Sequence, residues 1–565
     1  MVLRRRGRLV EPKVPAAREE RPLRLARRKN PLKTTGSSAA RAGDFRPFAR
    51  ASVPPHSGTV PNTRKPAGPH RRMPAQDSLW LHLDRPENLM VVTSVLWTRT
   101  PVDPAQLRSL VSDRLLARYP VYFQRPVRHG RALYWETDPG FDLADHLVVR
   151  DLPAPADQAA LEKFVAARRS EPLHPKRPLW TIDLLQGYHG GSVLVCRTHH
   201  AMADGIRLTQ VLFSLLNPVE GATVPHAKVG GAGPHREPVA QPVARLGATV
   251  LRALGDTGAK VQLQAARVHP VLESAVALPL LGATAAVGAT GAVAGFLSST
   301  LDGGPRRAAD TVASTATTLW HSLTGTGDLL GPSTATGLWD GEPGVEKTAA
   351  WGDPVPLITL GRIGHDTGTT INDVCTALVA GALDRYFAAH GTARTEPSDL
   401  GWLIPVSLSA FDDELPATLG NHFSLVLAQL PLGRRTFAER LAEVHRRVAR
   451  IRDSFEPVLT FGMQYAIAQS PAPVGLPLSR FFAGKAVGVL TNVPGPRTLM
   501  TLAGAEVDGI VGWAPCSGRQ AITICIFSYA GQVRFGLGSD RKLIPDPRLL
   551  VDALAEEFAE LAQRA

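Results

Sequence analysis

The chain has 565 residues but only four cysteines, and no CxxC pair or mixed Cys/His ligand spacing is present. This absence predicts neither a disulfide framework nor a zinc site and favours a reducing, cytoplasmic compartment. The sequence also lacks G-x-S-x-G, H-E-x-x-H and the phosphate-loop pattern G-x-x-x-x-G-K. The signatures of α/β-hydrolases, zinc proteases and phosphate-loop NTPases are therefore missing. We expect no bound metal and no resident cofactor.

Negative charge is scarce in the first 72 residues, which hold 19 Lys and Arg but 4 Asp and Glu. The remainder holds 44 and 46, so the formal net charge of +13 belongs to this segment and the rest is near neutral. A nucleic-acid-binding body is therefore not predicted. Residues 1–72 are rich in Arg, Pro, Ser and Gly and lack the apolar stretch of a secretory signal, which predicts a disordered basic tail. A solvated tail, a tail that binds anionic lipid or nucleic acid, and a true start at Met73 all stay open.

Hydrophobic patterning and composition divide the remainder into three parts. Residues 73–220 and 345–565 alternate short apolar strands with amphipathic helices, which predicts two α/β (α+β) domains. Residues 221–344 read as a linker that is rich in Gly, Pro and Ala. Within this linker, residues 274–301 carry no charge. That length permits a membrane span, although the Ala/Gly-rich composition favours a buried or interfacial helical hairpin.

Local signals locate several elements. Helices are predicted at 74–83, from Pro104 to about Ala117 after an Asp103 cap, at 159–169, at 206–216 and from Asp546 to Ala562. The Thr436/Glu439 pair is a capping box for a helix that runs to Phe455. Strands at 180–185 and 192–198 flank a Gly-rich turn and predict a hairpin. Further strands are expected at 90–97, 122–127, 132–137, 400–405, 423–430, 486–491, 507–511, 521–529 and 532–537.

The most informative stretch is His199-His200-Ala201-Met202-Ala203-Asp204-Gly205, which follows an apolar strand and precedes a helix. A His at the end of a strand is well placed to act as a general base at neutral pH, provided that one ring nitrogen is held and the other faces substrate. Adjacent side chains point apart in a pleated strand, which disfavours a shared metal. Gly205 indicates a tight loop, so Asp204 is expected to hold this loop rather than to relay a proton. The alternative is a pair of buried, hydrogen-bonded histidines without chemistry.

These residues resemble the bacterial wax ester synthase/diacylglycerol acyltransferases, and the resemblance extends in order from about Met73 to Gln563. Other matching segments are Met73-Pro74 with Asp77, Arg177-Pro178-Leu179-Trp180, Thr370-Ile371-Asn372-Asp373-Val374, Ile404-Pro405-Val406-Ser407-Leu408, Gly420-Asn421-His422-Phe423-Ser424, Thr491-Asn492-Val493-Pro494-Gly495-Pro496, Ala503-Gly504-Ala505 and Ser528-Tyr529-Ala530-Gly531. Two departures stand out. Asn88-Leu89-Met90 replaces the usual Pro-Met-His, and the Arg that usually follows Pro-Val-Ser is replaced near Leu408-Ser409.

The resemblance implies two chloramphenicol-acetyltransferase-like domains with a substrate tunnel between them. It places catalysis at the His199-His200 pair, with His200 as the base that deprotonates an acceptor hydroxyl. Asn372 is the candidate oxyanion donor, although a helix N-cap is the competing interpretation, and Asp373 can equally be a first-turn acid. Asp204 and Gly205 are expected to shape the motif loop.

The implied substrates are acyl-CoA as co-substrate and either diacylglycerol or a fatty alcohol as acceptor. The implied location is the cytoplasm, with peripheral attachment to the inner membrane face or to lipid droplets. Two alternatives stay open: an acyltransferase of this fold with another acceptor or a carrier-protein donor, and a non-catalytic protein that binds lipid surfaces.

Overall fold

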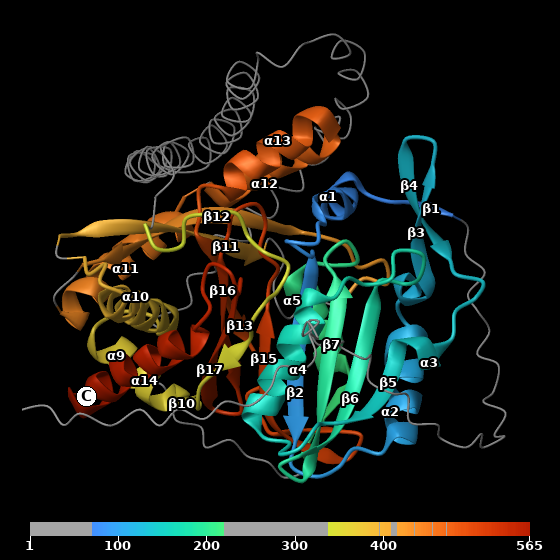
Figure 1. Cartoon of the computed structure of the whole chain (residues 1–565), viewed down its shortest axis with the longest axis horizontal. Helices are drawn as coiled ribbons and strands as arrows, with labels where there is room; N and C mark the ends of the chain where they lie inside the picture. The colour runs from blue at the N-terminus through green and yellow to red at the C-terminus, as the bar shows by residue number, and fades with distance from the viewer. Residues whose placement is uncertain are drawn as a thin grey trace, which may run out of the picture. The chain divides into compact units, whose positions relative to one another are not determined.

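The computed structural model describes residues 70–219 and 337–564, apart from 395, 408–414, 434–435, 455 and 471. Residues 1–69 of the predicted basic tail and the uncharged segment 274–301 lie outside these residues. The end of the predicted tail is ordered instead, because Arg71 and Arg72 pair with Trp135 and Tyr134 as a short strand. The described residues belong to one unit by their contacts. The described part contains two seven-stranded sheets and a smaller three-stranded sheet, with helices packed beside them (Figure 1).

The first large sheet carries the histidine motif. Its spatial order is β5-β6-β7-β2-β15-β14-β8. Its strands are β2 (Val91–Thr98), β5 (Leu147–Asp151), β6 (Trp180–Tyr188), β7 (Gly191–His199), β8 (Leu216–Pro218), β14 (Met500–Leu502) and β15 (Ala505–Trp513). The predicted hairpin is present, because β6 and β7 pair antiparallel. The sheet draws strands from both sides of the expected linker, and the domain boundaries inferred from sequence stay a prediction.

The second large sheet has the order β10-β17-β16-β13-β11-β12, with β9 paired to β17. Its strands are β9 (Ala350–Trp351), β10 (Val355–Pro356), β11 (Ser398–Ser407), β12 (Phe423–Leu432), β13 (Gly488–Pro494), β16 (Ile522–Tyr529) and β17 (Gln532–Ser539). The central pairs β11–β13 and β13–β16 are parallel. Parallel central strands are usually covered on both faces, and Trp402, Leu490 and Ile524 are accordingly buried. The three-stranded sheet contains β1 (Arg71–Arg72), β4 (Ala132–Thr137) and β3 (Gln124–His129).

Several helices begin directly after a residue that caps them, as expected at Asp103 and Thr436. Asp103, Asp157, Asp204, Thr370 and Thr436 each accept a backbone N–H of the first turn, and Thr370–Asp373 and Thr436–Glu439 form capping boxes. The α-helices are α1 (Ala75–Leu83), α2 (Pro104–Val111), α3 (Leu143–His146), α4 (Gln158–Ser170), α5 (Gly205–Ser214), α9 (Leu357–Asp366), α10 (Ile371–Ala389), α11 (Phe437–Arg452), α12 (Glu456–Gln469), α13 (Ala472–Ala483) and α14 (Pro547–Arg564). The predicted helix to Ala117 instead changes after Val111 into a short π-helical turn.

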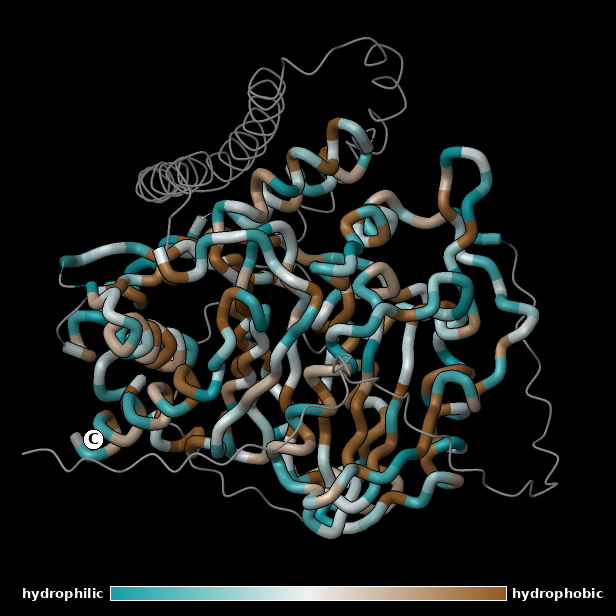
Figure 2. Tube along the Cα trace, in the orientation of Figure 1, coloured by the Kyte–Doolittle hydropathy of each residue, from teal (hydrophilic) through white to brown (hydrophobic). Residues whose placement is uncertain are grey.

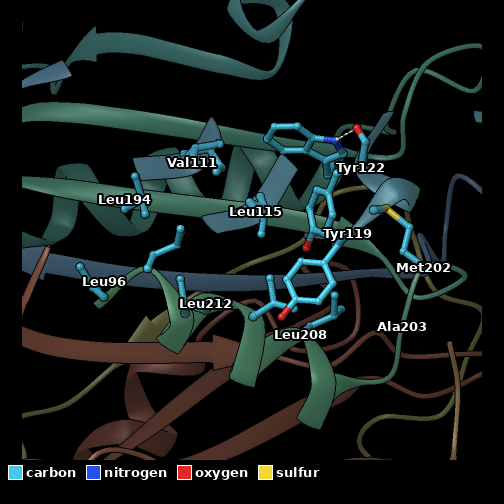
Figure 3. Packing of buried hydrophobic residues seen from close by; sticks show 14 of the residues in the cluster. Leu96, Val111, Leu115, Tyr119, Tyr122, Leu194, Met202, Ala203, Leu208 and Leu212 are labelled. Atoms are coloured by element: carbon cyan, nitrogen blue, oxygen red, sulfur yellow. Dashed lines mark hydrogen bonds between the residues drawn. The ribbon is translucent and has the colours of Figure 1, made fainter. Parts of the chain in front are cut away.

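The hydrophobic core lies on the faces of the two large sheets, where the apolar strand residues concentrate (Figure 2). Around the first sheet, Met202 and Ala203 of the motif pack in one cluster with Leu208 and Leu212 of α5 (Figure 3). In the same cluster Trp180 Nε1 donates to the Tyr122 carbonyl at 2.9 Å. The motif loop is therefore fixed by the core as well as by its own hydrogen bonds. All four cysteines are free, and Cys375 and Cys525 are buried.

Within the described ranges, no helix combines the length and the apolar composition that are needed to cross a bilayer.

Strand β15 connects the C-terminal half of the chain to the first sheet. It pairs antiparallel with β2, and the register shifts between Val507 and Gly509. A Cβ on Gly509 would lie 2.2 Å from Cζ2 of Trp97. The Trp97 ring stacks on Trp351 at 6.0 Å and lies under the Arg534 guanidinium at 4.9 Å, so it has little room to move.

We predict that Gly509→Ala lowers stability by about 1–3 kcal/mol, because the added methyl group overpacks the junction between β2 and β15. Thermal unfolding followed by circular dichroism measures the effect. Gly462→Ala in α12 is the control, since a Cβ there meets no atom within 4 Å. An unchanged melting temperature for Gly509→Ala would contradict this packing.

Candidate active site

The histidine motif begins where β7 ends. His199 is the last residue of β7 and pairs with Val91 of β2. The chain then leaves the strand: His200 N donates to the Met90 carbonyl at 2.8 Å, and Met202 N donates back to the His199 carbonyl at 3.0 Å. The two imidazoles contact different partners, as expected for adjacent residues at a strand end.

A segment from the other half of the chain, Leu419–His422, runs beside the motif loop. Gly420 forms a parallel bridge with Ala203, accepts the Asp204 N–H at 3.3 Å and donates to the Met202 carbonyl at 3.1 Å. Gly420 has φ +102°, a conformation that favours glycine. These bonds place the next residue, Asn421, against His200.

Asn421 determines which ring nitrogen of neutral His200 carries the proton. Its Nδ2 donates to the Asp77 carboxylate at 2.9 Å and to the His200 carbonyl at 2.8 Å, so its amide orientation is determined by two acceptors. Asn421 Oδ1 therefore accepts a hydrogen bond from His200 Nδ1 at 2.9 Å. A proton on Nδ1 leaves the lone pair on Nε2, which bonds to no described residue. This is the tautomer that a general base requires.

Aromatic rings enclose the imidazole. Trp80 of α1 stacks on His200 with centroids 4.2 Å apart, and Phe423 lies 5.2 Å away. His200 is 5% exposed. Burial lowers the pKa of His200 to about 4, and the negative charge of Asp204 opposes this shift only in part. His200 is therefore neutral at pH 7.

Asp77 lies behind Asn421, on the helix that also supplies Trp80. It is 1% exposed, and its Oδ2 has no hydrogen-bond partner among the described residues. Burial raises the pKa of Asp77 to about 6, while the hydrogen bond from Asn421 and the charge of Arg71 partly offset this effect. The arrangement Asp77–Asn421–His200 thus joins a carboxylate to an imidazole through one amide.

His199 has a different environment. Its Nδ1 accepts the Ala201 N–H at 3.0 Å, which places its proton on Nε2, 3.8 Å from Asp84 Oδ1. Asp84 in turn accepts the Met90 N–H at 2.7 Å. Met90, one of the three residues that depart from the family pattern there, is buried. Its N–H donates to Asp84 and its carbonyl accepts from the His200 N–H. The Leu179 carbonyl of the Pro-Leu-Trp segment accepts the His199 N–H at 2.9 Å.

Asp204, in the motif loop, connects the start of α5 to the Leu419–His422 segment. Its Oδ1 caps α5 by accepting the Arg207 N–H at 3.0 Å, and its Oδ2 accepts the His422 N–H at 2.9 Å. Arg207, whose Nε lies 3.9 Å from the carboxylate, donates through Nη1 to the Leu419 carbonyl and to His422 Nδ1. Gly205 is the first residue of α5, and a Cβ at this position would meet no atom within 4 Å. These contacts fit the expected role of Asp204 in holding the loop. Its effect on activity stays a prediction.

Asn372 and Asp373 lie at the start of α10, and no hydrogen bond between described residues joins either to His200. Thr370, not Asn372, is the N-cap of this helix. Asn372 Oδ1 accepts from Asn492 Nδ2 at 2.9 Å, so two segments of the family pattern meet there. Asp373 completes the capping box and accepts from His445 Nδ1 at 2.8 Å.

A cavity of about 30 Å³, room for one or two water molecules, lies between residues 88–93, the start of β16 and the end of β17. Arg169 and Lys347 are among its lining residues, whereas His200 is not. The expected substrate tunnel stays a prediction. Within the part of the chain that the structure describes, no three His, Cys, Asp or Glu side chains are grouped to hold a metal.

Sequence reasoning quoted the segments around Asp77 and Asn421 without assigning them a role, and it missed Trp80. Asp77 carried one local signal: it lies three residues before Trp80 and four before Leu81, so a carboxylate falls on the apolar side of a short helix. The partner of Asn421 is separated from it by 221 residues and has no local signal. Leu408 and Ser409, the second departure from the family pattern, lie outside the described residues.

The fold that holds this buried histidine is shared with a solved structure. The structure matches the wax ester synthase/diacylglycerol acyltransferase from Marinobacter aquaeolei with a TM-score of 0.57 at 19% identity, covering 87% of this chain and 99% of that one.

Two family models match: the wax ester synthase/diacylglycerol acyltransferase catalytic domain at residues 73–317 and the C-terminal domain of the same family at residues 419–562. The chain belongs to this family and is an acyltransferase. It is 26% identical over 496 residues to a Mycobacterium tuberculosis protein provisionally named a diacylglycerol O-acyltransferase, covering 82% of this chain and 88% of that protein. It is 25% identical over 493 residues to the O-acyltransferase WSD of Acinetobacter baylyi, covering 85% and 95%.

We predict that Asp204→Ala lowers the free energy of unfolding by about 1–3 kcal/mol, because α5 loses its cap and the partly buried His422 N–H loses its acceptor. Denaturant unfolding measures this change. Asp204→Asn should cost less, since an asparagine still caps the helix. Equal unfolding midpoints for the wild type and Asp204→Ala would contradict the role of Asp204 in holding the loop.

Proposed function

We propose that the protein transfers a long-chain acyl group from acyl-CoA to the hydroxyl of diacylglycerol or of a fatty alcohol, forming triacylglycerol or a wax ester. The family and the names of the relatives support this substrate class. The observation that carries the mechanism is the hydrogen bond from His200 Nδ1 to Asn421, which leaves Nε2 as an unprotonated base.

In this mechanism His200 Nε2 removes the proton from the acceptor hydroxyl as the oxygen attacks the thioester carbonyl. A tetrahedral oxyanion forms, the C–S bond breaks, and the imidazolium returns its proton to the departing CoA sulfur. No acyl-enzyme is needed, because both substrates meet at one base. The low pKa of His200 keeps the imidazole neutral before the reaction and makes the imidazolium a strong acid for the second proton transfer.

Asn372 is our candidate for the oxyanion donor. Its Oδ1 is occupied by Asn492, so its amide N–H groups are the atoms left to donate. His199 is better suited to support the motif loop than to exchange protons with substrate, since both of its nitrogens face the protein.

We predict that His200→Ala lowers kcat for ester formation by about 10²–10⁴-fold, the usual contribution of a general base. Purified protein is incubated with a long-chain acyl-CoA and either dioleoylglycerol or hexadecanol, and both CoA and the ester are quantified by chromatography. His365→Ala changes an exposed histidine on α9 and serves as the control.

An unchanged rate for His200→Ala would contradict the base assignment. The absence of ester with any long-chain alcohol would contradict the proposed function. An acceptor screen would then decide between another alcohol acceptor and a non-catalytic lipid-binding protein.

We also propose that the protein works at a lipid surface, where its apolar acceptors are found. Helix α13 supports this part of the proposal, because it is apolar on two sides. Leu478 and Phe482 pack on a buried cluster that also includes Leu79 of α1. An adjoining side exposes Val474, Pro477 and Phe481, which share one helical face, beside Arg480.

The position of α13 suits delivery of an apolar acceptor. It contacts α1, the helix whose Trp80 stacks on His200, and Figure 1 shows α12 and α13 next to α1. An exposed apolar helical face with an adjacent cation matches the interface between anionic headgroups and acyl chains.

We predict that Phe481→Ser weakens binding to vesicles of phosphatidylcholine and phosphatidylglycerol by about tenfold, because burying a phenylalanine contributes about 1.5–3 kcal/mol. Vesicle flotation measures the bound fraction. Ile358→Ser is the matched control, since Ile358 is exposed on α9 away from α13. Equal flotation of Phe481→Ser and the wild type would contradict the role of this face.

A further inference from the structure

Helix α1 approaches the histidine from two directions. Trp80 stacks on the face of the imidazole, while Asp77, one turn earlier, reaches His200 through Asn421. The mechanism above uses His200 and Asn421 and assigns nothing to Asp77. The carboxylate is nonetheless almost completely buried, with one oxygen bonded to Asn421 and the other unpaired among the described residues.

Packing alone does not explain a carboxylate at this position. Burying one costs free energy unless hydrogen bonds or a close cation compensate, and here the structure provides a single side-chain donor. Arg71 and Arg207 act on Asp77 only through their charges, without a hydrogen bond. An incompletely compensated group beside a base is typical of functional sites rather than of structural ion pairs.

We infer that Asp77 is a positioning residue for the acyl transfer: its carboxylate orients the Asn421 amide and thereby holds His200 in the tautomer with a free Nε2. The inference rests on the proposed function. If Asp77 Oδ1 were removed, one of the two acceptors that determine the amide orientation would be lost. The amide could then rotate and present its NH₂ to Nδ1, which would move the imidazole proton to Nε2 and remove the base.

A second effect acts during the reaction. When His200 Nε2 takes the proton, the ring gains a positive charge in a buried site. The Asp77 carboxylate polarises the Asn421 amide toward the ring and stabilises that charge. Outer partners that orient a metal-binding histidine typically contribute 10–100-fold to metal affinity or activity, and we expect an effect of the same order here.

The arrangement predicts a distinctive pH profile. The charged and titratable groups around Asp77 are Arg71 of β1, Arg207 of α5, His200 and, beyond Gly420, His422. Burial lowers the pKa of both histidines. Asp77, whose pKa is raised to about 6, therefore protonates before His200 as the pH falls. Activity should decline through about pH 6, well above the pKa of His200.

The test measures kcat and KM for ester formation with full-length protein between pH 4.5 and 9, with dioleoylglycerol or hexadecanol varied at saturating acyl-CoA. We expect Asp77→Ala to lower kcat by about 10–100-fold with KM within about twofold. Asp77→Asn keeps an acceptor without a titrating charge. It should retain more activity than Asp77→Ala, and its decline near pH 6 should move toward the pKa of His200. Asp183→Asn, which alters a buried carboxylate paired with Arg150 and Arg168, is the control and should keep the wild-type profile.

The inference is overturned if folded Asp77→Ala and Asp77→Asn keep the wild-type kcat. It is also overturned if kcat falls while the position of the acid decline stays unchanged, because that result indicates a purely structural role. If Asp77→Ala does not fold, the pH profile of Asp77→Asn decides alone. A wild-type protein that forms no ester contradicts the proposed function, whereas an active wild type with an inactive His200→Ala and unaffected Asp77 variants contradicts only this inference.

Discussion

The hydrogen bond between His200 and Asn421 is the contact on which the rest of the site depends. It joins residues that are 221 positions apart and sets the tautomer of the imidazole. Asp204 and Arg207 hold the Leu419–His422 segment against the motif loop, so Asn421 reaches His200 from a fixed backbone. Asp204 therefore holds the Leu419–His422 segment in place as well as its own loop.

The arrangement of strands supports the same contact. Strands β14 and β15 come from the C-terminal half of the chain and extend the sheet whose strand β7 ends at His199. Because β15 pairs with β2, and β2 pairs with β7, a movement of the C-terminal half relative to the motif would have to break one of these two ladders. A site assembled from two distant segments needs such a connection, since the position of its base is set by contacts from both.

Much of this structure was predictable from local patterns, because those patterns have local causes. The Thr436/Glu439 capping box, the Asp103 cap and the turn between β6 and β7 depend on residues within a few positions of one another. Asn421 and Asp77 gained their roles only from tertiary contacts, which no spacing in the sequence encodes. The pairing of β15 with β2 and the two-sided apolar character of α13 were missed for the same reason.

The central claim is that Asn421 accepts a hydrogen bond from the Nδ1–H group of His200 and thereby leaves Nε2 free to act as a base. The most direct measurement is kcat for ester formation by Asn421→Ala at pH 8, where Asp77 is ionised and His200 is neutral. The account predicts a decrease of at least about 10–100-fold, with little change in KM for either substrate, because the substrate-binding surfaces are untouched. A folded Asn421→Ala protein with a kcat within twofold of the wild type would contradict it.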